Sequence, residues 1–170
     1  VATQARGLAR IQGGRVVQTL RKTDGLASDD LYSLHVDSAG TLWTGTVGGG
    51  LSRVTPSGIY NLTTAGGLTS ERVWSFLEDQ EGTFWIGTAG GGLNALRETR
   101  FSTFSRRDGL LHDGIRTVRE DAEGTLWIGS NGGGLSRLPR NRPLVHPRST
   151  DGLCNNQVWA TPGMPNGTAL

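Results

Sequence analysis

The chain has 170 residues and nearly balanced charge, with 17 basic and 15 acidic side chains. Its 27 glycines are about twice the usual share, but they follow no three-residue period and only 6 residues are proline, which excludes a collagen-like chain. The basic residues are spread out and no apolar run is long enough for a membrane span, so we expect neither nucleic-acid binding nor direct membrane insertion. The glycine excess predicts many turns between short strands.

The chemistry-bearing residues form no familiar metal or redox pattern. The only cysteine, Cys154, cannot form an internal disulfide, so packing must stabilise the fold. Residues 1–4 have neither a charged leader nor an apolar stretch, and we expect no signal peptide in this segment. Because the histidines occupy unrelated positions and closely spaced ligand pairs are missing, we expect no metal and no cofactor.

Two independent markers recur along the chain with a period of 42 residues. The first is Gly-Thr-(Leu or Phe)-Trp, which begins at Gly40, Gly82 and Gly124 and is followed each time by a glycine triplet and a leucine. The second is a Gly-Leu pair after Asp or Gly, and it recurs in step with the first. Two markers at one period indicate an internal repeat. The predicted units are 24–65, 66–107 and 108–150, with partial units at 1–23 and 151–170.

Each unit contains signals for four strands. In the unit 66–107 we expect strands at 73–78, 83–88, 93–97 and 101–104, separated by a hairpin turn at 79–82 and by the triplet at 90–92. Four short strands per unit are typical of a propeller blade, and the nearly apolar first strand fits a sheet packed between neighbours. The predicted fold is an all-β propeller segment of four-stranded antiparallel blades, a single segment over 1–170.

The two ends of the chain align with interior positions of the repeat. We therefore expect a partial propeller with two alternatives. Either the C-terminal strands pair with the N-terminal ones and close a ring, or the open end faces meet another copy in a homo-oligomer. We slightly favour self-association, because an uncovered blade edge is apolar and unpaired.

The combined motif resembles the two-component regulator propeller repeat. It comprises Asp-Gly-Leu, a Val-x-Ser strand, Gly-Thr-Leu-Trp-Ile-Gly-Thr and Gly-Gly-Gly-Leu-x-Arg, and the resemblance covers about 24–160. It implies a ligand-sensing module of a bacterial signal-transduction sensor, in the periplasm or otherwise outside the cytoplasm. In that family the propellers usually precede a membrane helix and an output domain, and the ligand is a small polar molecule such as an oligosaccharide, or a protein.

Candidate ligand-binding residues vary where the frame of the repeat is constant. Seven residues after each marker glycine, at the start of the first strand, the units carry Tyr32, Trp74, Arg116 and Trp159. The loops before these strands add Glu71, Arg72, His112, Asp113, Asn155 and Asn156. Aromatic rings beside charged and amide groups suit a polar ligand with an apolar face, such as a sugar.

Other readings stay open at this point. The recurrence of Trp43, Trp85 and Trp127 in mid-strand indicates the core between blades, and the recurrent aspartates are typical of turn openings. The candidate loops would be ordinary solvated loops in a structural or protein-interaction propeller. Streptogramin lyases carry a similar repeat and use His and Glu, roles that His112 and Glu71 would suit. We expect a non-catalytic protein, with a lyase as the further alternative.

Overall fold

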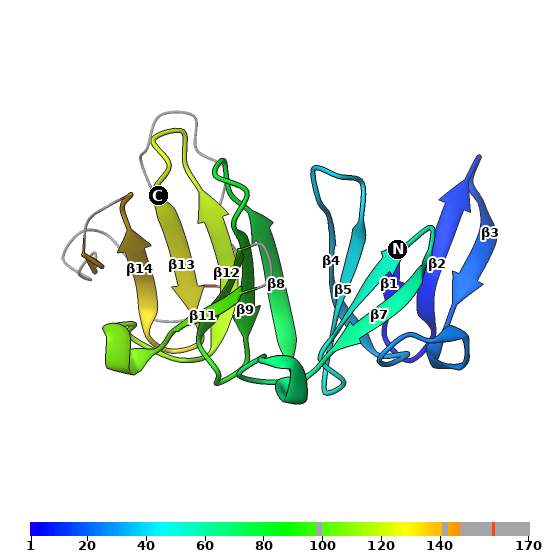
Figure 1. Ribbon diagram of the computed structural model, residues 1–170, viewed down its shortest axis with the longest axis horizontal. Helices are drawn as coiled ribbons and strands as arrows, with labels where there is room; N and C mark the ends of the chain where they lie inside the picture. The colour runs from blue at the N-terminus through cyan, green and yellow to red at the C-terminus, as the bar shows by residue number, and fades with distance from the viewer. Residues whose placement is uncertain (98–99, 141–142, 147–157, 159–170) are drawn as a thin grey trace. The chain divides into compact units, whose positions relative to one another are not determined.

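The structure of the chain is a computed structural model that describes residues 1–97, 100–140, 143–146 and 158 (Figure 1). It consists of short antiparallel strands and three single-turn 3-10 helices. The chain divides into two compact units, Val1–Trp74 and Ser75–Leu170. Within the described part, no helix combines the length and the apolar composition needed to cross a membrane.

Unit 1 contains two antiparallel sheets. The first consists of β1 (Ala2–Thr3), β2 (Gly7–Gln12) and β3 (Arg15–Leu20), paired in chain order. The second has four strands, also in chain order: β4 (Leu31–Val36), β5 (Leu42–Thr46), β6 (Leu51–Thr55) and β7 (Gly58–Leu62). The 3-10 turns η1 (Lys22–Asp24) and η2 (Thr64–Gly66) follow the last strand of each sheet.

The next sheet has the order β11-β10-β9-β8, and the division between the units falls inside β8. Its strands are β8 (Val73–Glu78), β9 (Phe84–Thr88), β10 (Leu93–Arg97) and β11 (Arg100–Phe104). These bounds lie within one residue of the strands predicted from the sequence. The prediction of a four-stranded antiparallel blade is therefore confirmed for this unit of the repeat.

The last sheet follows η3 (Arg106–Asp108) and belongs to unit 2. It consists of β12 (Ile115–Glu120), β13 (Leu126–Ser130) and β14 (Gly134–Leu138), paired in chain order. Beside β14, the backbone of Val145 exchanges two hydrogen bonds with Arg137, of 2.7 and 2.8 Å. Val145 thus lies where the fourth strand of this blade belongs.

The core of unit 2 lies where the strands are apolar on both faces. All five residues of β9 are buried, as expected for a strand covered on both sides. The buried cluster joins the blades on either side of η3 and comprises Trp85, Leu93, Ala95, Leu110, Ile115, Val118, Leu126 and Ile128. In unit 1, Leu8, Leu26 and Leu31 form a separate cluster.

The Gly-Leu marker is the end of each 3-10 turn. Gly109 has a φ of 102°, a left-handed conformation that side chains disfavour, and Leu110 after it is only 4% exposed. Asp108 closes the turn, because its Oδ2 accepts hydrogen bonds from the backbone N and the Oγ of Ser105, both of 2.9 Å. The marker therefore recurs because it reverses the chain and inserts a leucine into the core.

The last glycine of each triplet is a second position that only glycine can occupy. Gly92 has a φ of 78°, and a Cβ there would collide with the carbonyl oxygen of Phe104. The buried hydroxyl of Thr88 closes the loop by donating a 2.8 Å hydrogen bond to the carbonyl of Gly92. Ser130 makes the equivalent bond to Gly134, of 2.9 Å. The triplet is thus a closed turn between the two middle strands of the blade.

Candidate functional site

Two of the variable strand-start residues are the extra residues of β-bulges. The pairing of β4 with β5 shifts register between Leu31 and Ser33, so Tyr32 is the extra residue of a bulge. The pairing of β12 with β13 shifts in the same way around Arg116. Bulges redirect side chains and are frequent beside functional sites. The fold therefore gives one position of the repeat an irregular backbone and a different side chain in different blades.

Tyr32 and Trp74 are brought together within unit 1. Their ring centroids are 6.2 Å apart with the planes tilted by 40°, a favourable geometry for an aromatic pair. Tyr32 remains 43% exposed and Trp74 is half-buried. Arg72, two residues before Trp74, is exposed. This aromatic pair, Tyr32 and Trp74, is therefore a ligand-accessible surface with a cationic side chain close to it in sequence.

The remaining strand-start candidates belong to unit 2 or lie outside the described residues. Arg116 is half-buried on β12 and belongs to unit 2. Trp159, Asn155 and Asn156 lie outside the described residues. Tyr32 and Trp74 are thus the strand-start candidates that are shown in contact within one unit.

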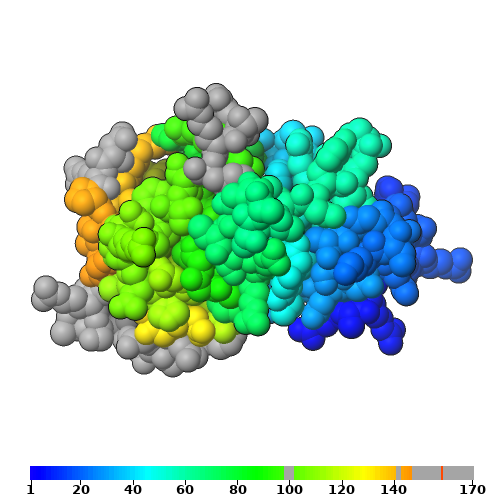
Figure 2. All heavy atoms as spheres, turned by 60° about the horizontal axis from the view of Figure 1, so that its bottom comes forward, coloured from blue at the N-terminus to red at the C-terminus, as the bar shows by residue number. Residues whose placement is uncertain are grey.

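His112 occupies a turn-capping position in the repeat. Its Nδ1 accepts a 2.8 Å hydrogen bond from the backbone N–H of Gly114. At the equivalent positions, the hydroxyls of Ser28 and Ser70 accept hydrogen bonds from the backbone N–H two residues further on, of 3.0 and 3.3 Å. The imidazole therefore does what a serine hydroxyl does in the other blades. The loop 109–114, which contains His112, follows η3 and lies on the face of unit 2 that Figure 2 brings forward.

The two acidic candidates hold the same loops together. Asp113 Oδ1 accepts a 2.7 Å hydrogen bond from the backbone N–H of Arg106, and the Asp113 carbonyl accepts another of 2.7 Å from Gly92. Glu71 Oε1 accepts a 3.0 Å hydrogen bond from the hydroxyl of Thr64. Both carboxylates therefore connect the loop to the preceding 3-10 turn.

The recurrent tryptophans combine burial with one polar contact. Trp43 and Trp85 are each 8% exposed, whereas Trp127 is half-buried. Each indole Nε1 donates a hydrogen bond of 2.7 or 2.8 Å to the aspartate six residues earlier; the acceptors are Asp37, Asp79 and Asp121. Sequence reasoning expected these aspartates to open turns and missed the bond to the indole. The constant six-residue spacing was the signal that could have revealed it.

These hydrogen bonds also change how the aspartates titrate. Burial alone raises the pKa of Asp37 and of Asp121. The hydrogen bonds from the indoles of Trp43 and Trp127 and from nearby backbone N–H groups outweigh it, so both pKa values lie below the usual range. The carboxylates stay ionised and serve as acceptors. Among the described residues, no group of His, Cys, Asp or Glu side chains is arranged to hold a metal ion.

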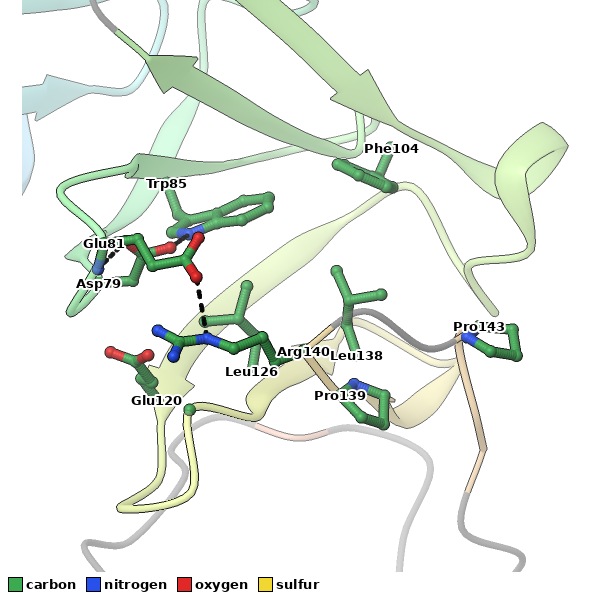
Figure 3. Close-up of a pocket in the computed structure, with 11 residues that line it drawn as sticks. Asp79, Glu81, Trp85, Phe104, Glu120, Leu126, Leu138, Pro139, Arg140 and Pro143 are labelled. Atoms are coloured by element: carbon green, nitrogen blue, oxygen red, sulfur yellow. Dashed lines mark hydrogen bonds and ion pairs between the residues drawn. The ribbon is translucent and has the colours of Figure 1, made fainter.

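Unit 2 also contains a pocket that sequence reasoning did not find. It has a volume of about 400 Å³ and lies between the blade of β9 and the blade of β13. Trp85 and Phe104 form one wall, and Leu126 and Leu138 form the other (Figure 3). The hairpin turn at 79–82 borders it, at the opposite strand ends from η3 (Figure 1). No local motif marks it, because its walls come from two blades.

The polar rim of this pocket is mainly acidic. Glu81 pairs with Arg97 and Arg140 at 2.9 Å each, and all three side chains are exposed. Glu120 Oε2 accepts a 2.8 Å hydrogen bond from the backbone N–H of Gln80. The pKa of Glu120 is raised, first by burial and also by the charges of Asp79 and Asp121. The hydrogen bond from Gln80 and the charge of Arg140 lower it by less. An added positive charge would therefore stabilise ionised Glu120.

A family model described as two component regulator propeller matches residues 67–90 and 109–132. These two segments of the chain match the two-component regulator propeller repeat. Each match runs from the marker glycine through the first strand of the blade, the hairpin turn and the second strand to the triplet. The matched segments therefore contain the Asp–Trp hydrogen bond and the bulge position described above.

Solved structures of similar fold provide a second comparison. The extracellular domain assigned to the hybrid two-component system BT3049 from B. thetaiotaomicron is 27% identical, with a TM-score of 0.75 over 92% of this chain and 21% of that chain. The extracellular domain assigned to BT4673 from the same organism is 20% identical, with a TM-score of 0.62 over 71% of this chain and 18% of that chain. The chain thus spans about a fifth of these sensor domains.

The propeller fold is also shared with an enzyme. Virginiamycin B lyase from Staphylococcus aureus is 16% identical, with a TM-score of 0.61 over 83% of this chain and 48% of that chain. At this identity the likeness concerns the fold alone. No curated protein matches the chain.

Proposed function

We propose that the chain is a non-catalytic recognition segment of a bacterial extracytoplasmic sensor, and that unit 1 binds a small polar ligand with an apolar face, such as an oligosaccharide, at the aromatic pair. The observation that carries the proposal is the contact of Tyr32 with Trp74 at the bulged start of a strand, where the ring of Tyr32 stays exposed. Tyr32 is at an irregular position of a regular frame, and at that position the described blades carry different side chains.

The chemistry of the pair suits a sugar. A pyranose ring has an apolar face of C–H groups that packs on aromatic rings, while its hydroxyls need polar partners at the edge. The phenol of Tyr32 and the exposed guanidinium of Arg72 supply such partners in unit 1. Ligand contacts here would shift the balance between alternative packings of neighbouring propellers, which an output domain elsewhere in the protein then reads.

Two further observations support a sensor over a lyase. The similar solved domains are assigned to two-component systems and are extracellular, which also supports a location outside the cytoplasm. In addition, His112, which would suit a lyase, accepts a hydrogen bond from its own loop, and Glu71 accepts one from the preceding 3-10 turn. His112 Nδ1 and Glu71 Oε1 thus stabilise the local turn geometry.

The test is a calorimetric titration of the chain with a panel of neutral and acidic oligosaccharides. Tyr32→Ala and Trp74→Ala should each remove saturable binding while the circular dichroism spectrum and the melting temperature stay close to those of the parent. Tyr60→Ala is the matched control, because Tyr60 is 55% exposed on the outer strand β7 and should leave binding unchanged.

Two results would overturn the proposal. One is binding that survives both aromatic substitutions. The other is the absence of saturable binding and of any thermal shift across the panel, which would favour a protein-interaction propeller.

A further inference from the structure

Two of the three recurrent tryptophans carry a guanidinium over the ring. The Cζ of Arg53 lies 5.6 Å from the ring centroid of Trp43, and the Cζ of Arg137 lies 5.4 Å from that of Trp127. In both blades the arginine is directly opposite the tryptophan on the neighbouring strand. Such contacts are attractive because the face of an indole ring is electron-rich. A cation over the tryptophan is therefore part of the pattern of this repeat.

The middle blade of this series departs from the pattern. Opposite Trp85 the strand β10 carries Ala95, which is too short and has no charge. The indole Nε1 is occupied by Asp79, and the ring of Phe104 lies 5.7 Å from the Trp85 ring. The Trp85 ring instead forms part of the wall of the 400 Å³ pocket (Figure 3). Ala95 therefore places no cation over the ring of Trp85, where the other two blades have a guanidinium.

The lining of the pocket is mainly negative, opposite in charge to the guanidinium that Ala95 does not supply. Three carboxylates line it, from Asp79, Glu81 and Glu120, against one guanidinium from Arg140. Apolar side chains form the rest of the walls, and the volume of about 400 Å³ is within the range of small-ligand sites. The pocket thus combines an indole, an acidic rim and an apolar interior.

We propose that this pocket binds a compact organic cation with an apolar body, such as a quaternary amine, which takes the place over Trp85 that a guanidinium occupies over Trp43 and Trp127. The cation lies against the indole, and Glu120 and Glu81 face its charge. A ligand can displace the ion pair of Arg140 and Glu81 at the rim, because that pair is exposed and such pairs are weak. The proposal is independent of saccharide binding in unit 1.

Unit 1 provides an internal comparison. A second pocket, of about 390 Å³, is lined by β2, β3 and residues of the following sheet. Arg10 stands there at the position of Ala95, and Val1 aligns with Thr44. Its described lining holds neither an aromatic ring nor a carboxylate. The same place in the fold therefore has different chemistry, and we expect it to bind no cation.

The experiment compares choline with its uncharged isostere 3,3-dimethylbutan-1-ol, using calorimetry and the indole N–H signals in a nitrogen–proton NMR spectrum. Choline should bind saturably with a dissociation constant of about 1 mM or tighter. It should shift the Trp85 indole signal, assigned by its loss in Trp85→Phe. The isostere should bind at least tenfold more weakly, by an amount on the order of one to two kcal/mol.

Three variants complete the test. Ala95→Arg restores a guanidinium opposite Trp85 and should abolish choline binding. Glu120→Gln keeps the test decisive if the arginine variant does not fold, and it should weaken choline binding at least tenfold. Arg10→Ala, in the second pocket, is the matched control and should leave binding unchanged. Equal binding of choline and its isostere would overturn the proposal. So would retention of choline binding in folded Ala95→Arg and in Glu120→Gln, or no saturation up to roughly 20 mM choline.

Discussion

The indole Nε1 of Trp85 donates a 2.7 Å hydrogen bond to Oδ2 of Asp79. The other oxygen of the same carboxylate accepts hydrogen bonds from the backbone N–H groups of Thr83 and Glu81, of 2.7 and 3.0 Å. One side chain therefore closes the hairpin between the first two strands of the blade and fixes the orientation of the core indole. The same arrangement joins Asp37 to Trp43 and Asp121 to Trp127.

The first prediction concerns this bond. Asp79→Asn should lower the free energy of unfolding by about 1–3 kcal/mol, because the amide cannot accept at both of its ends and leaves a buried donor unsatisfied. In a Trp85→Phe background the same substitution should cost clearly less, since the indole donor is gone. Urea unfolding of the four proteins of this cycle measures the difference. Strictly additive losses would show that the two side chains do not interact.

The second prediction concerns acid. In the folded state the pKa values of Asp37 and Asp121 lie below those of the unfolded chain. Their contribution to stability is therefore present above the ordinary carboxyl pKa of about 3.9 and is lost as the pH falls through the folded pKa. The free energy of unfolding should decrease as the pH drops below roughly 4. The double substitution Asp37→Asn and Asp121→Asn should make this dependence on pH less steep. Thermal melts from pH 3 to pH 7 measure it.

Glu120 provides the contrast of opposite sign. Its folded pKa is raised, first by burial, so its ionised form opposes folding at neutral pH and this effect disappears as the pH falls. Glu120→Gln should therefore be neutral or slightly stabilising at pH 7, with the difference from the parent vanishing in acid. A loss of stability at pH 7 that persists in acid would contradict this account.

The third prediction concerns His112. Because its Nδ1 caps the same turn that Ser28 and Ser70 cap, His112→Ser should keep the parent stability, whereas His112→Ala should lose about 0.5–1.5 kcal/mol. Chemical unfolding at pH 7 separates the two variants. The serine variant also tests catalysis, since a lyase that used this imidazole would lose its turnover in a fully folded protein.

The fourth prediction compares two glycines of one triplet. Gly50 has a φ of 80°, and a Cβ would collide with the carbonyl of Leu62. Gly50→Ala should therefore cost at least about 2 kcal/mol. Gly48 has no neighbour within 4 Å of an added Cβ and no positive φ, so Gly48→Ala is the control and should change stability by less than about 0.5 kcal/mol. Equal effects would mean that the turn relaxes around the side chain.

Much of the fold was predictable because its signals are local. The 42-residue period, the four strands of the unit 66–107 and the turns at 79–82 and 90–92 depend on residues a few positions apart, and the structure has them where they were expected. The side-chain partner of each repeat aspartate was missed although it is only six residues away, because turn chemistry alone explained the aspartate.

The site was less accessible from the sequence. The repeat alignment placed Tyr32 and Trp74 at equivalent positions, but their ring contact joins residues 42 apart and depends on how their strands pack. Their role in binding stays a prediction. The functions of His112 and Asp113 in holding their loop followed only from the backbone geometry around η3.

The fixed spacing of the glycine turns, together with four strand signals in each unit, determined from the sequence that this chain is a series of propeller blades, because a left-handed turn selects glycine wherever it recurs. The tertiary structure decided which side chains meet between blades. The pocket joins Trp85 to Leu126, and Glu81 to Arg140, pairs separated by a whole blade of chain. Such contacts follow from the packing of two sheets, and no local preference of the residues specifies them.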